Sequence, residues 1–89
     1  MTLTLTGRLQ AEGAMPWFLH RGRLLNLVGW ITRQDDRTIA MVLSGPADLL
    51  DAMEVACSLG PADVWVESYT RSSYEFETLP EALTIRESA

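Results

Sequence analysis

Hydrophobic and polar positions alternate strictly from Thr2 to Thr6, in the order Thr-Leu-Thr-Leu-Thr. A period of two predicts a half-buried strand whose two leucines, Leu3 and Leu5, face the core. A loop over residues 7–16 follows, and Pro16 suits the first turn of a helix. Apolar residues then recur at helical spacing as far as Asn26, a residue that tolerates the left-handed conformation of a helix end. The pattern predicts a strand that turns through a loop into a helix.

The middle of the chain reads as a hairpin and a second helix. Two apolar runs over residues 27–32 and 38–44 flank a polar turn at 33–37, which is typical of paired strands. Ser44-Gly45-Pro46 then breaks the strand pattern, and Gly60-Pro61 ends the helix that follows. The apolar stripe predicted for this helix contains Leu49, Leu50, Met53, Ala56 and Cys57, and the opposite, solvated face contains Asp48, Asp51 and Glu54.

The last third predicts a fourth strand over residues 64–70, a polar loop over 72–81 and a short terminal strand over 82–86. The order is therefore strand, helix, strand, strand, helix, strand. We expect an α+β protein with a ferredoxin-like βαββαβ sandwich, in which two helices cover one face of a four- to five-stranded antiparallel sheet. Residues 1–89 form one such domain, because a chain of 89 residues is too short for two cores.

Composition narrows the classes of function. A formal net charge of -5 opposes binding to a nucleic-acid backbone, so we expect no nucleic-acid partner. The single cysteine, Cys57, excludes an intrachain disulfide and fits a reducing compartment. No apolar run reaches membrane-spanning length, and the start lacks the basic-then-apolar layout of a signal peptide. The simplest expectation is a cytoplasmic protein with no membrane association.

Candidate chemistry gathers at the loop that leads into the first helix. The free N–H groups and the positive end of the dipole at a helix N-terminus suit an anion. The only histidine, His20, has no nucleophile or carboxylate at a defensible spacing, so we expect it on the helix surface. Cys57 lies on an apolar stripe and is expected in the core. We expect neither a metal site nor a cofactor, since one histidine and one cysteine do not suggest zinc.

Four short motifs together resemble the acylphosphatase family. They are Gly7-Arg8-Leu9-Gln10 with Gly13 in register, Gly29-Trp30-Ile31, Ser44-Gly45-Pro46 and the closing Ile85-Arg86. The joint spacing of the four motifs carries the resemblance. It implies hydrolysis of acyl phosphates without metal or covalent intermediate. Loop N–H groups and one arginine would hold the phosphate, and an asparagine on the second strand would position the attacking water.

Both catalytic positions of that family pattern are changed in this chain. The position of the arginine holds Met15, and the position of the asparagine holds Arg33. The residues that the resemblance assigns to the anion-binding loop are Gln10, Ala11, Glu12, Gly13, Ala14 and Met15. Methionine has no donor for a phosphate, arginine has no acceptor to orient a water, and Glu12 adds a negative charge to the loop. We therefore expect no catalytic residues and a domain that binds a small anion or a protein partner.

Alternatives remain open at this point. Arg33 either rebuilds an anion site from across the cleft or is a solvated hairpin residue paired with Glu12, Asp35 or Asp36. The second role is the expected one, because exposed ion pairs are common. A divergent acylphosphatase could instead use Arg33, Arg8 or Arg21 in place of the missing arginine.

A third alternative is a purely structural dimerisation domain, whose loop would be closed by Met15 and Glu12. The fourth strand could then be a free sheet edge at which a second copy pairs to form a homodimer. An exposed Trp17 or Trp65 would mark an interface, whereas Trp30 is expected to be structural.

Overall fold

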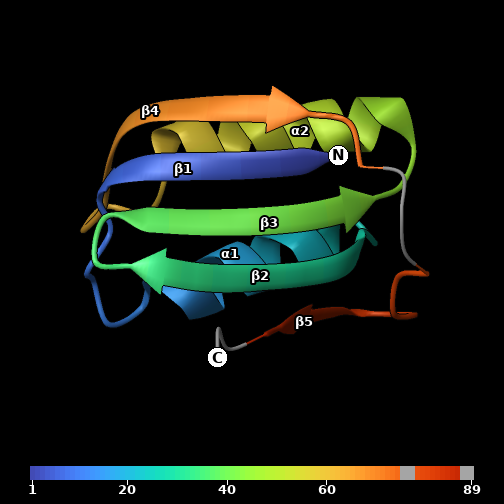
Figure 1. The fold of residues 1–89 in the computed structure, drawn as a ribbon, viewed down its shortest axis with the longest axis horizontal. Helices are drawn as coiled ribbons and strands as arrows, with labels where there is room; N and C mark the ends of the chain where they lie inside the picture. Colours follow the sequence, from blue (N-terminus) through green and yellow to red (C-terminus); the bar gives the residue numbers. More distant parts are fainter. Residues whose placement is uncertain (75–77, 87–89) are drawn as a thin grey trace.

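The computed structural model describes residues 1–74 and 78–86. The chain forms five strands and two helices in the order β1 (Thr2–Arg8), α1 (Ala14–Leu24), β2 (Val28–Asp35), β3 (Thr38–Ser44), α2 (Ala47–Leu59), β4 (Trp65–Ser72) and β5 (Leu83–Ile85). Both helices lie on the same face of the sheet (Figure 1). The predicted ferredoxin-like βαββαβ architecture is confirmed.

The sheet has the strand order β4-β1-β3-β2-β5, so the first strand lies between two strands that follow it much later in the chain. Pairings among β1 to β4 are antiparallel, as predicted. β5, however, pairs with β2 in parallel, and the prediction of a wholly antiparallel sheet was wrong on this point. The reason is the direction of β4, which runs opposite to β2. β5 starts at the end of the sheet where β4 stops, but at the opposite edge, so it runs antiparallel to β4 and parallel to its neighbour β2 (Figure 1).

The hydrophobic core fills the space between the sheet and the helices. Leu3 and Leu5 are fully buried there, as their alternation predicts, together with Phe18 of α1 and Met53 of α2. Gly22 has a packing role in the middle of α1, since a Cβ at that position would lie 2.2 Å from a methyl carbon of Leu83. Glycine has a lower helix propensity than alanine, but its lack of a side chain lets β5 pack closely against α1.

Element boundaries differ from the sequence prediction near the loop. β1 continues to Arg8, whose backbone pairs with Trp65 of β4, and the loop is therefore shorter than 7–16. α1 begins at Ala14, so Pro16 lies in its first turn as expected. β2 extends to Asp35, which shortens the predicted polar turn. Asn26 ends α1 with a φ of 56°, the left-handed conformation that its identity favours.

β4 is an edge strand and carries a large exposed aromatic side chain, Trp65, which is 68% exposed. Its charged residues are paired within the chain: Glu67 with Arg37, and Arg71 with both Asp51 and Glu54. Pairing with a second copy stays a prediction. Part of the predicted 72–81 loop, residues 75–77, lies outside the described residues. Within the described part of the chain, the helices are too short and too polar to cross a membrane.

Candidate functional site

The cradle loop, defined as residues 10–15, connects the end of β1 to the first turn of α1. A turn at its base is closed by the N–H of Ala14, which donates to the carbonyl of Ala11 at 3.0 Å. The backbone N–H groups of residues 10–13 make no hydrogen bond to any other residue that the structure describes. Unpaired N–H groups beside a helix N-terminus are the elementary form of an anion site.

Arg33 reaches the cradle loop from the end of β2. It lies opposite Ile39, whose side chain is fully buried on the helix-covered face, and residues directly opposite in a sheet point to the same face. The register shifts between Arg33 and Asp35, a bulge of the kind that re-aims a side chain. The guanidinium Nη2 donates to the carbonyl oxygen of Leu9 at 2.6 Å, and Nη1 lies 3.5 Å from the carbonyl oxygen of Asp35.

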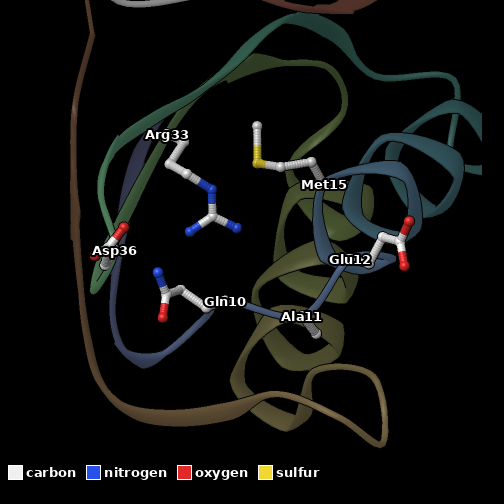
Figure 2. Close-up of a pocket in the computed structure, with 6 residues that line it drawn as sticks. All are labelled: Gln10, Ala11, Glu12, Met15, Arg33 and Asp36. Carbon is white, nitrogen blue, oxygen red and sulfur yellow. The ribbon is translucent and has the colours of Figure 1, made fainter.

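These elements enclose an open cavity of about 480 Å³, the cradle cavity. The residues that line it are Gln10, Ala11, Glu12, Met15, Arg33 and Asp36. Figure 2 shows the Arg33 guanidinium pointing into the space between the loop and the hairpin, toward Gln10 and Met15, while the Glu12 carboxylate points away from it. The cavity therefore brings one guanidinium and one side-chain amide to the exposed backbone of the loop.

The structure separates the six loop residues into two groups. Gln10, Ala11, Glu12 and Met15 line the cradle cavity. Ala14 is fully buried beneath the loop, and Gly13 is exposed at the position before α1. Met15 is half-buried and packs against the hydrophobic core, so its thioether contributes an apolar wall where a phosphate would require a donor.

The other arginines considered from the sequence lie elsewhere. Arg8 lines a second cavity of about 290 Å³, which shares Gln10, Ala11 and Asp36 with the cradle cavity. Arg21 lies over the ring of Trp17, with its Cζ 5.2 Å from the ring centroid. Asp36 is a cavity residue that the sequence suggested only as an ion-pair partner, because a turn residue gives no signal of where its side chain points.

The remaining titratable candidates stand apart from the cavity. His20 is exposed on α1. Cys57 is fully buried, and loss of hydration raises the pKa of its thiol to about 12. The described residues contain no group of three histidine, cysteine or acidic side chains that could hold a metal ion.

Comparison with known proteins places these features in context. No protein-family model matches the chain. It is 38% identical to an acylphosphatase from Acidiphilium cryptum over 64 residues, which are 70% of each chain. The fold is similar to that of an acylphosphatase from Coxiella burnetii, with a TM-score of 0.87, 18% identity, and 96% of this chain and 88% of that one covered. An acylphosphatase from Bacillus subtilis gives a TM-score of 0.84 at 21% identity, covering 96% and 94%.

Proposed function

This chain belongs to the acylphosphatase family, and we propose that it binds a small anion at the cradle loop without hydrolysing acyl phosphates. The protein is then a binding domain built on the frame of a hydrolase. The observation that supports this proposal is that Met15 and Arg33 line the cavity, at the positions that the resemblance assigns to the arginine and the asparagine of the family pattern.

Met15 removes the donor on which the family's chemistry depends. Its side chain is held against the core and offers neither charge nor a hydrogen bond. Hydrolysis of an acyl phosphate develops charge on the phosphoryl oxygens, and each missing donor of this kind costs roughly 10²–10³ in rate. A cavity with Met15 in this position can admit an anion but stabilises a transition state poorly.

Arg33 cannot perform the role of an asparagine. A guanidinium has donors only, so it has no lone pair with which to orient an attacking water. Its Nη2 is also committed to the carbonyl of Leu9 at 2.6 Å, which fixes the side chain against the loop. Held in that way, Arg33 supports the binding of an anion in the cavity rather than the activation of water.

One observation favours a second candidate, a divergent acylphosphatase. The guanidinium of Arg33 points into the cradle cavity (Figure 2), where it could hold a phosphate in place of the missing loop arginine. In this alternative the side-chain amide of Gln10, which lines the same cavity, would have to position the water. Hydrolysis by the unmodified chain is the result that separates the two candidates.

The test is hydrolysis of benzoyl phosphate by the purified chain and by variants that restore the family residues. We expect no rate above the uncatalysed reaction for the unmodified chain. Met15→Arg together with Arg33→Asn should raise the rate by about 100-fold or more, because a donor and an acceptor are both restored. His20→Arg is the matched control, since it adds one arginine to an exposed position of the same helix.

Rapid turnover by the unmodified chain would overturn the proposal. If Arg33→Asn alone then abolished that turnover, Arg33 would be the replacement arginine of the divergent enzyme. If the double variant gained nothing over the His20→Arg control while remaining folded, the assignment of positions 15 and 33 to the family's catalytic pair would be wrong.

A further inference from the structure

The charges around the cradle cavity do not suit a dianion. One guanidinium, Arg33, and one residue with a carboxylate, Asp36, line the cavity, whereas the carboxylate of Glu12 points away from it (Figure 2). A phosphate dianion gains most where positive charge is in excess, as at sites built from several arginines. One donor of the Arg33 guanidinium is also occupied by its hydrogen bond to the carbonyl oxygen of Leu9. The balance of charges favours a ligand with a single negative charge.

The volume of the site exceeds the needs of an inorganic ion. The cradle cavity measures about 480 Å³, and the adjoining cavity of about 290 Å³ shares the wall formed by Gln10, Ala11 and Asp36. Small-molecule pockets in proteins span roughly 300–1,000 Å³. A ligand can therefore extend from the loop past Gln10 toward the second cavity.

The shared wall and the second cavity carry negative charge. Asp36 lines both cavities, and Asp63 lines the second. Of the two arginines in the second cavity, Arg37 is paired with Glu67 at 2.8 Å, so its charge is largely compensated. Arg8 offsets one of the two carboxylates, which leaves the second cavity with a net negative charge. A ligand that ran from Arg33 toward Asp36 would meet a cationic site and then an anionic one.

We propose that the ligand of this site is a small amino carboxylate, bound with its carboxylate at Arg33 and its ammonium group at Asp36. The proposal rests on the proposed function, because it names the class of anion that the cradle loop takes. A planar carboxylate fits the edge of a guanidinium, and the charge-assisted bond is stronger than one to a neutral group. The ammonium group of the ligand would offset the negative charge of Asp36, which would repel a simple anion.

The test compares three kinds of probe by titration of the amide resonances of the cradle loop. The first is the series of ω-amino carboxylates from β-alanine to 6-aminohexanoate, the second the unbranched carboxylates of the same lengths, and the third inorganic phosphate. We expect the best amino carboxylate to bind at least about ten-fold more tightly than its amine-free counterpart, a difference of roughly one charge-assisted hydrogen bond. Phosphate should bind more weakly than that amino carboxylate.

Asp36→Asn should abolish this preference for the amine while leaving the binding of the simple carboxylate intact. Asparagine is well tolerated in turns, so the hairpin should keep its conformation. Asp48→Asn is the matched control, because Asp48 is an exposed carboxylate on α2 that lines neither cavity. The control should retain the full preference.

The outcomes distinguish this inference from the proposed function. If anions shift the loop resonances but phosphate binds most tightly, or if the amine makes no difference, the ligand class is wrong and anion binding stands. If Asp36→Asn keeps the preference for the amine, the placement of the ammonium group is wrong. If no probe shifts the loop resonances, both proposals fail. Turnover of benzoyl phosphate would overturn the proposed function alone.

Discussion

Two regions meet at the cradle loop, and they tolerate change very differently. Beneath the loop, Leu9, Phe18 and Ile39 are fully buried and belong to one hydrophobic core. Above it, Met15 and Arg33 line an open cavity and are only partly buried. The fold depends on the first set, because buried apolar area dominates folding stability. The second set can change without loss of the fold, which is how a family member can keep its architecture while its cavity alters.

The sharpest form of this comparison places a core residue beside a surface residue of the same helix. Phe18→Ala should lower the free energy of unfolding by about 3–5 kcal/mol, because it removes a fully buried ring and leaves a cavity. His20→Ala, at an exposed position two residues further on, should change it by less than about 0.5 kcal/mol. Urea denaturation of both variants measures the difference. Equal effects would mean that the core is not where the structure places it.

Arg33 tests whether the cavity and the core are independent, since it lines the cavity and also donates a hydrogen bond to the backbone of Leu9, a core residue. Arg33→Met keeps the length of the side chain but leaves the Leu9 carbonyl without its charged donor at 2.6 Å. We expect a loss of about 1–2 kcal/mol in the free energy of unfolding. Arg37→Met, which removes an exposed ion pair with Glu67, is the matched control and should cost less than about 1 kcal/mol. An Arg33 variant as stable as the control would show that this arginine serves the cavity alone.

The smallest effect concerns the thiol in the core. Burial raises the pKa of Cys57 from 9.0 to about 12, so the folded chain keeps the thiol neutral where the unfolded chain ionises. This stability is fully present below pH 9 and is lost as the pH rises toward 12. Between pH 9 and pH 10 the contribution to the free energy of unfolding should fall by about 1 kcal/mol. Cys57→Ala should lack this decrease, and identical pH profiles for the two chains would contradict the burial of the thiol.

Much of the frame follows from short-range patterns in the sequence. The alternation of Thr2–Thr6 is sufficient to place Leu3 and Leu5 in the core, and Asn26 is sufficient to mark the end of α1. The parallel pairing of β5 could not be predicted in this way. It depends on where the long connection after β4 places the three residues of β5, and no local periodicity in the sequence carries that information.

The cavity was harder to predict than the frame for a physical reason. The resemblance to the family placed Met15 and Arg33 near the loop, but the direction of a side chain depends on register. The bulge at Gln34 turns the end of β2, and it leaves no pattern in a polar stretch. The place of Asp36 in the wall of both cavities depends on the same turn.

The position of β1 in the sheet has a consequence for the order in which the chain assembles. β1 leads directly into the cradle loop, yet its two neighbours, β3 and β4, begin at Thr38 and Trp65. Closing such distant pairs costs loop entropy before any contact compensates for it, so non-local sheets fold slowly. During synthesis β1 is made before β3 and β4, so it cannot pair in the sheet until those strands have been synthesised. The cradle loop is therefore encoded early but acquires its rigid support among the last parts of the molecule to form.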